Sequence, residues 1–367
     1  MRSAVRIGVL IVCITLAPAS GSASAFETDV FGYEDWQRAV SQLPVNPQEV
    51  VYPFHVTPEM VEWAQLKLAP HMTNSPDVRL QALQNAFFQP GEFEFEYEQA
   101  QTLTAVDAFA SRNGNCMSFT SLFVALSRSV GIPTFLVSVK RQPDVEMDEG
   151  LVVVNRHVVA GFRAPSRVYT YDFYVASSKQ VASHRVIDDL AASAIYHTNI
   201  GGLAIRQDDL STAIRNLQIA TVLAPEWAPA WVNMGVAYSR LGDQEAAFDA
   251  LQRALAAEPG NSSALTNLSR LYREQGRIEE ADNAMRAAAE GTRNPFTLIT
   301  MADAEILRGN HDEARRYLRR ARWWYAKEPY VFDALARLAE VEGDADKAQK
   351  YRKKAGELRN DQASDSD

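Results

Sequence analysis

Cysteine is scarce in this 367-residue chain, which holds only two. Cys13 lies in an apolar run near the N-terminus, and the other is Cys116. With one cysteine outside that run, the rest of the chain has neither an internal disulfide nor a Cys-x-x-Cys metal motif. A lone thiol is either buried and inert or kept for chemistry, and its count alone does not choose between the two.

Other features are missing as well. The sequence beyond the N-terminus has no apolar run long enough to span a membrane, no glycine-rich phosphate loop and no His-Glu-x-x-His zinc motif. We therefore expect no cofactor, no metal ion and no membrane span in the mature protein. Basic residues are outnumbered, with Lys+Arg 37 against Asp+Glu 46 and a net charge of −9. Such an acidic chain lacks the positive surface that binds nucleic acid.

Residues 1–25 have the order of a secretory signal peptide. Arg2 and Arg6 precede an apolar run, and small residues follow it up to Ala25. The apolar run is about ten residues long, which is short for a bilayer span. We expect cleavage after Ala25 and export to the periplasm or the outside of a bacterial cell. An uncleaved N-terminal anchor is the alternative.

The remaining chain divides into four segments. Residues 26–90 are a helical extension, with helix starts predicted at Thr57-Pro58 and Ser75-Pro76. Residues 91–190 mix helix and strand patterns and carry the candidate chemistry. Residues 196–358 are repetitive. The last segment, 359–367, is polar and acidic, and we expect it to be disordered.

The repetitive segment has a period of about 34 residues. Each unit predicts two helices with one apolar face, which only a stack of units can bury. The pattern resembles the tetratricopeptide repeat and implies a superhelical array of four to five units, the first beginning near Tyr196. The recurring small residues are Gly242 and Ala247, Gly276 and Ala281, Gly309 and Ala314, Gly343 and Ala348, and the units are separated by Pro225, Pro259, Pro295 and Pro329.

That resemblance implies a concave surface that binds a protein partner or a protein substrate. The alternative is that the array only braces the segment before it. A basic helix in the array could bind an acidic partner, although we favour a solvated helix face as its explanation. Its arginines are Arg315, Arg316, Arg319, Arg320 and Arg322.

Cys116 lies where a helix should begin. Gly114 and Asn115 precede it, an apolar helical stretch through Leu126 follows, and Gly131-Ile132-Pro133 ends that stretch. At a helix N-terminus, the positive end of the dipole and the free backbone N–H groups favour a thiolate. The same N–H groups can stabilise a developing oxyanion.

Three strand-like segments come next, at residues 134–140, 151–162 and 168–174. His157 is in the second and Asp172 in the third. If these strands are antiparallel neighbours beside the helix, both side chains can face Cys116. His157 would then accept the thiol proton and Asp172 would orient the imidazole.

The run from Gly114 to Pro133, followed by His and Asp on successive strands, resembles the core of the transglutaminase-like superfamily. The resemblance covers about residues 91–175 and implies a papain-like α+β fold. It implies Cys116 as nucleophile, His157 as general base and Asp172 as its orienting partner. Val159 and Phe173 depart from the family pattern of an aromatic and a proline at these places, which leaves the subfamily and the substrate open.

Simpler interpretations exist for each of these residues. Cys116 could be a packed core residue and His157 a satisfied strand histidine. His184 and His197 are the two rival histidines. The acidic loop residues could bind calcium, although a solvated hairpin is the simpler explanation; they are Asp144, Glu146, Asp148 and Glu149.

The sequence thus predicts an exported cysteine enzyme that forms an acyl-thioester on Cys116 from a peptide or carboxamide. Water would resolve the thioester in a protease or amidase, and a lysine amine would resolve it in a cross-linking acyltransferase. We favour hydrolysis, because an exported thioester meets water unless its site excludes it. The alternatives are an inactive envelope scaffold and acyl transfer from a small thioester donor, for which no cofactor-binding loop is visible.

Overall fold

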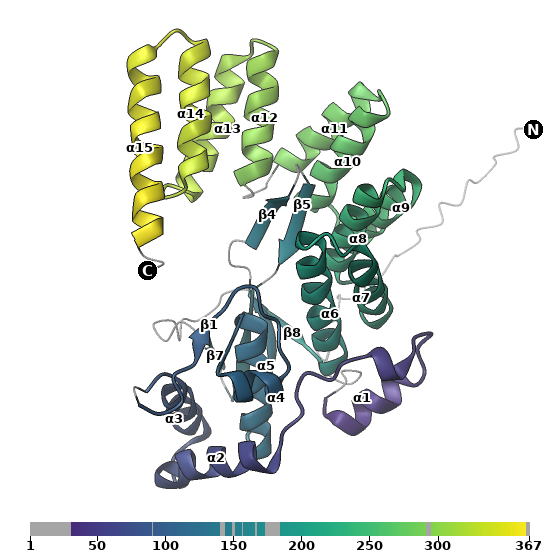
Figure 1. Ribbon diagram of the computed structural model, residues 1–367, viewed down its shortest axis with the longest axis vertical. Helices are drawn as coiled ribbons and strands as arrows, with labels where there is room; N and C mark the ends of the chain where they lie inside the picture. Colours follow the sequence, from purple (N-terminus) through teal and green to yellow (C-terminus); the bar gives the residue numbers. More distant parts are fainter. Residues whose placement is uncertain are drawn as a thin grey trace, which may run out of the picture.

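The computed structural model describes residues 31–89, 91–139, 144–148, 151–155, 157–165, 167–172, 184–290 and 295–364. The expected signal peptide lies outside these residues. Within them, a mixed α/β part is followed by a curved array of helices (Figure 1). The expected fold class, a papain-like α+β domain before an all-α array, is confirmed. Among the described helices, none is long and apolar enough to cross a membrane.

Helices of the mixed part begin where local signals place them. Thr57 accepts a hydrogen bond from the Met60 N–H and caps the helix that starts at Pro58. Thr104 caps the helix that starts at Ala105 in the same way, through the Asp107 N–H. The elements are α1 (Tyr33–Val40), η1 (Pro47–Glu49), α2 (Pro58–Leu68), η2 (Ala69–His71), α3 (Pro76–Phe88), α4 (Ala105–Ser111) and α5 (Cys116–Ser129).

Helix α5 packs against the centre of a four-stranded antiparallel sheet of order β7-β6-β3-β8. Aromatic rings from α2 and α3 fill the other side of α5: Phe87 meets Phe119 edge-on, with ring centroids 5.5 Å apart. The described residues of the segment 26–90, which are 31–89, therefore share one hydrophobic core with α5. The strands are β3 (Thr134–Val139), β6 (Val158–Ala164), β7 (Arg167–Tyr171) and β8 (His184–Ile187).

The strand expected at 151–162 is wrong as one element. It divides into β5 (Leu151–Asn155) and β6, and β5 pairs with β4 (Asp144–Asp148) outside the four-stranded sheet. The reason is tertiary, because β5 lies against α8 (Ala228–Leu241) and α10 (Ser262–Glu274) of the array. A further short pair, β1 (Glu96–Tyr97) and β2 (Asn113–Gly114), is parallel.

The array consists of successive helix pairs, as the period predicts. Its first helix begins at Asp189, earlier than the expected 196. Its last helix continues to Ser364, so the expected disordered tail is wrong for residues 359–364, while 365–367 lie outside the described residues. The remaining helices are α6 (Asp189–Arg206), α7 (Leu210–Leu223), α9 (Gln244–Ala257), α11 (Ile278–Ala289), α12 (Pro295–Leu307), α13 (His311–Trp324), α14 (Pro329–Val341) and α15 (Ala345–Ser364).

Asp189, the first residue of α6, joins the array to the mixed part. Its carboxylate is 1 % exposed and accepts two hydrogen bonds from the Arg128 guanidinium, at 2.8 and 2.9 Å. It also accepts hydrogen bonds from the Tyr52 hydroxyl and the Gly32 N–H. Apolar residues of α5 and of α6–α8 belong to the same buried cluster. The two parts are therefore packed together by a shared core and by an ion pair whose carboxylate is buried.

Candidate active site

Cys116 is the first residue of α5, and Asn115 caps this helix. The Asn115 side chain accepts hydrogen bonds from the N–H groups of Met117 and Ser118, at 3.1 and 3.2 Å. Its own amide nitrogen donates to the Thr102 hydroxyl at 2.6 Å. The cap therefore holds the start of the helix against the preceding loop. Cys116 itself is partly exposed and forms no disulfide.

The turn before Cys116 requires glycine. Gly114 has a φ of +143°, and a Cβ at this position would collide with the Ser118 side chain. Ser118 cannot readily move away, because its hydroxyl donates to the Gln101 carbonyl at 3.0 Å and accepts from the Leu103 N–H at 2.8 Å. Close packing of this turn thus determines where the sulfur lies.

His157 and Asp172 lie at the ends of neighbouring strands. His157 comes immediately before β6 and Asp172 immediately after β7, so neither lies within a strand as expected. Since β6 and β7 are antiparallel, the start of one strand is beside the end of the other. The imidazole Nε2 is 3.0 Å from the Asp172 carboxylate, which is nearly buried.

The imidazole is also hydrogen-bonded with Cys116. Because Nε2 is paired with Asp172, Nδ1 is the ring nitrogen left for the sulfur. Burial lowers the pKa of His157, but the hydrogen bonds to Asp172 and Cys116 and the attraction of their charges outweigh burial and raise it to about 10. The structure thus brings together the three residues that the sequence singled out, in a form that supports an imidazolium beside the sulfur.

Two further residues hold this arrangement, and sequence reasoning missed both. Gln84 of α3 is buried and donates from Nε2 to the Asp172 carbonyl at 2.6 Å. Thr120, one helical turn after Cys116, donates to the Val158 carbonyl at 3.2 Å. A polar residue on the apolar side of a helix was the available signal for Gln84, and the spacing of four from Cys116 was the signal for Thr120.

The sequence of residues 67–172 matches the profile of the transglutaminase-like superfamily, and this range contains all three candidate residues. Residues 67–172 form a transglutaminase-like core domain. The match begins within α2, so it includes part of the segment that we had expected to be an extension. Residues 240–295 and 295–320 each match tetratricopeptide repeat profiles. Both resemblances seen in the sequence are therefore confirmed.

Several solved structures resemble part of the chain. A crystal structure of MamA is 20 % identical to this chain, with a TM-score of 0.36. The match covers 45 % of this chain and 97 % of the MamA chain. PilF from Pseudomonas aeruginosa is 20 % identical to this chain, with a TM-score of 0.39. The match covers 45 % of this chain and 76 % of the PilF chain. YrrB, described as a TPR protein with an unusual peptide-binding site, is 19 % identical to this chain, with a TM-score of 0.33. The match covers 46 % of this chain and 87 % of the YrrB chain. Comparison with curated protein sequences finds no significant match.

The rival histidines of the sequence lie away from the transglutaminase-like site. His197 of α6 is buried, accepts from the Val51 N–H at 3.1 Å and pairs with the Asn216 side chain at 2.8 Å. Burial lowers its pKa, so this histidine is a neutral structural link. His184 begins β8, which is separated from β6 by β3.

The acidic loop residues give no metal cluster in the part of the chain that the structure describes. Residues 144–148 form β4, and Glu149 lies outside the described residues. Among the described side chains, no three His, Cys, Asp or Glu residues lie together in a group that could hold a metal ion.

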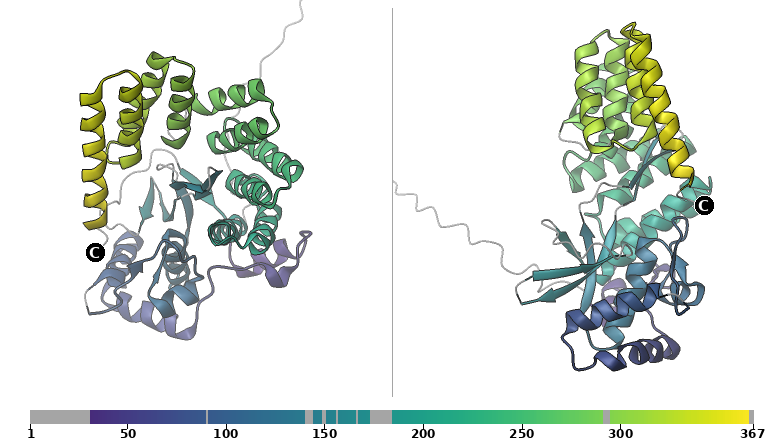
Figure 2. Two further views of the ribbon diagram at one scale, coloured as in Figure 1. Left: turned by 45° about the horizontal axis from the view of Figure 1, so that its top comes forward. Right: turned by 90° about the vertical axis from the view of Figure 1, so that its left-hand side faces the viewer.

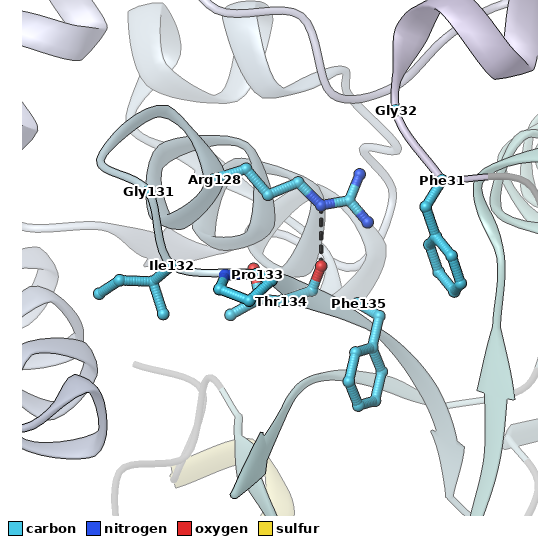
Figure 3. A pocket seen from close by; sticks show the side chains of 8 residues that line it. All are labelled: Phe31, Gly32, Arg128, Gly131, Ile132, Pro133, Thr134 and Phe135. Carbon is cyan, nitrogen blue, oxygen red and sulfur yellow. Dashed lines mark hydrogen bonds between the residues drawn. The ribbon is translucent and has the colours of Figure 1, made fainter. Parts of the chain in front are cut away.

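A pocket opens near the other end of α5, away from Cys116 (Figure 3). Phe31, Ile132 and Phe135 give it apolar walls, and the Arg128 Nε donates to the Thr134 carbonyl at 2.8 Å beside it. Because α5 is 14 residues long, about 20 Å separates its two ends. This pocket is therefore not part of the candidate active site.

Proposed function

We propose that the transglutaminase-like domain is an active cysteine enzyme that cleaves a peptide or carboxamide bond through an acyl-thioester on Cys116. The observation that carries the proposal is the Cys116–His157–Asp172 arrangement, in which a partly exposed sulfur at a helix N-terminus is hydrogen-bonded with a histidine 3.0 Å from a carboxylate. A nucleophile, a base and a group that orients the base are the parts that this chemistry needs.

The reaction uses each residue in turn. The Cys116 thiolate attacks the carbonyl carbon, and the backbone N–H of Cys116 at the start of α5 stabilises the negative oxygen. When the C–N bond breaks, the His157 imidazolium gives its proton to the leaving amine. Water then attacks the thioester and loses a proton to His157, which releases the acid and restores the Cys116 thiol. Asp172 keeps the ring oriented and stabilises its charge throughout.

Partial exposure of Cys116 supports hydrolysis over transamidation, because water can reach a thioester formed there. An amine could attack the same thioester from the same side, so cross-linking is the second outcome of one mechanism. For the whole protein we propose export through residues 1–25. The array, made of repeats that act as protein-interaction modules, would bind the protein that is the substrate or that delivers it.

The direct test is alkylation of Cys116 by iodoacetamide from pH 5 to 9, followed by mass spectrometry. We expect rapid labelling near pH 6 that is lost in His157→Ala and retained in His311→Ala, a control histidine at the start of α13. Labelling that rises only above about pH 8 and is the same in both variants would instead support an inactive scaffold.

A second experiment separates the two reactions. The mature protein is incubated with casein and a fluorescent primary amine, and both peptide release and amine incorporation are measured. We expect Cys116-dependent cleavage to exceed incorporation. Incorporation faster than cleavage would overturn the assignment as a hydrolase while leaving the thioester mechanism in place.

A further inference from the structure

The strand pair β4 and β5, called here the β4–β5 ribbon, continues the sheet toward the array. In the four-stranded sheet, the pairing of β3 with β6 ends at Ser138, which lies opposite Val158. In the ribbon, the pairing of β4 with β5 begins at Asp144, which lies opposite Asn155. His157 follows β5 by two positions and lies between the two paired stretches. The ribbon and the candidate base are therefore adjacent parts of one strand connection.

The ribbon lies on the inner side of the curved array (Figure 2). Its strand β5 contacts α6, α8 and α10, which are the first helices of three consecutive pairs. These contacts define what we call the strand face of the array. A strand that crosses the first helix of each pair in turn runs along the array rather than over one of its ends.

Helical geometry shows which side chains belong to the strand face of α8. Gly235 packs on Leu251 of α9, where an added Cβ would lie only 2.6 Å from the leucine Cγ. Asn233 is two residues earlier, which is about 200° around the helix. Asn233 therefore lies on the side of α8 away from α9, and it is fully buried.

The same position is repeated in the neighbouring pairs. In α6, Gly201 packs on Leu217 of α7, and Asn199 is two residues earlier. In α10, Asn267 stands one repeat period after Asn233. Asn199 and Asn267 are 9 % and 1 % exposed. Asparagine thus recurs once per pair on the three helices that β5 contacts.

The asparagine series ends where the contact ends. Counted from the glycine that follows the first helix of each pair, the residues equivalent to Asn267 are Thr300 in α12 and Ala334 in α14, and neither carries a carboxamide. A carboxamide offers both a donor and an acceptor, so it can pair with a peptide N–H and a peptide C=O whatever the side chain beside them. The strand face of the first three pairs is therefore suited to extended backbone, and the later pairs are not.

We propose that the strand face is a binding site for an extended segment of a protein partner, rich in β-branched apolar residues, and that β5 occupies this site until the partner displaces it. The occupant seen in the structure supports this chemistry, since β5 has the sequence Leu-Val-Val-Val-Asn and is an extended strand. Because β5 is so close to His157 in the chain, its displacement would release the histidine from Cys116. This last step rests on the proposed enzymatic function.

The test replaces residues 144–155 of the mature protein with a glycine-serine linker of the same length. A fluorescent peptide of residues 144–155 is then titrated into both proteins, and its anisotropy is measured. We expect binding about tenfold or more tighter to the linker variant, because in the intact chain the tethered ribbon competes at high effective concentration. A linker variant that keeps its helical circular dichroism but fails to bind the peptide would overturn the proposal.

Matched controls locate the site. Adding Asn267→Ala to the linker variant should weaken peptide binding, whereas Asn283→Ala, an exposed asparagine on the second helix of the same pair, should leave it unchanged. A peptide carrying Val153→Pro should bind more weakly than the native peptide, because proline removes a strand N–H. Equal effects of the two asparagine changes, or equal binding of the two peptides, would contradict the proposal.

The proposed effect of β5 displacement on the active site is tested by measuring the reactivity of Cys116. Alkylation of Cys116 near pH 6 should be slower in the linker variant than in the intact chain. Peptide binding with an unchanged alkylation rate would refute the coupling while keeping the binding site. Cys116 that is unreactive in both proteins would refute the proposed enzyme, and the anisotropy result would stand by itself.

Discussion

Gln84 holds the backbone of Asp172 from across the core, with its Nε2 2.6 Å from the Asp172 carbonyl oxygen. The two residues are 88 positions apart and come from a helix and a strand end. Asp172 has already left β7, so the sheet ladder no longer fixes its backbone. The buried amide of Gln84 instead holds the Asp172 backbone through this hydrogen bond. We infer that Gln84 is a positioning residue for the His157–Asp172 pair.

Replacing Gln84 with alanine should slow Cys116 alkylation near pH 6 and make it resemble an ordinary thiol in its pH profile. The change removes a hydrogen bond that the Asp172 carbonyl accepts, which should also lower the free energy of unfolding by about 1–3 kcal/mol. Gln89→Ala, at the exposed end of α3, is the control and should change neither quantity. A Gln84→Ala protein that loses stability but keeps the wild-type alkylation profile would show a structural role only.

Replacing Asp172 with asparagine should change the pH dependence of alkylation in a defined direction. The carboxylate raises the pKa of His157, so its removal disfavours the imidazolium that supports a thiolate at low pH. We expect much slower labelling than wild type near pH 6, with the two rates converging near pH 9, where an ordinary thiol ionises by itself. Parallel profiles at all pH values would refute this role of Asp172.

The raised pKa of His157 also predicts a pH-dependent stability. Its pKa rises from 6.5 to about 10 on folding, so the protonated ring stabilises the folded state most fully below pH 6.5. That contribution is lost as the pH rises through about 10. The difference in unfolding free energy between wild type and His157→Gln should therefore shrink from pH 6 to pH 10 in urea denaturation. A difference that grows over this range would contradict the assignment.

Gly114→Ala should destabilise the protein and disturb Cys116. A positive φ of +143° is unfavourable for alanine, and the added Cβ collides with Ser118. We expect a loss of about 1–3 kcal/mol or more, with slower alkylation of Cys116. Gly356→Ala is the matched control, because this helical glycine has no atom near an added Cβ and alanine is the better helix former. It should be neutral or slightly stabilising.

Local signals in the sequence were enough for much of the fold. The start of α5 at Cys116 follows from Gly114, Asn115 and the apolar stretch after them, all within one short window. The repeat period likewise predicts the helix pairs, since each pair depends mainly on its own residues and its neighbours. The chain order of Cys116, His157 and Asp172 supplied the candidate residues.

Other features depended on contacts between distant segments. Apolar, β-branched residues stand on both sides of the polar triplet that ends at His157, and nothing local in them predicts that β5 leaves the sheet for the array. The buried amide of Gln84 looks like any polar residue in a helix until α3 is placed beside the end of β7. Asn199, Asn233 and Asn267 are spaced by the repeat period in the sequence, but only the tertiary structure shows that β5 contacts the three helices that carry them.

By itself, the sequence determined the helices, the repeat period and the presence of one cysteine at a helix N-terminus. These depend on capping, on apolar periodicity and on residues close in the chain. The tertiary structure decided that His157 meets Cys116 and Asp172, that Gln84 supports the pair and that β5 lies on the array. These contacts join segments far apart in the chain, because burial and hydrogen-bond pairing are satisfied only when the whole core is assembled.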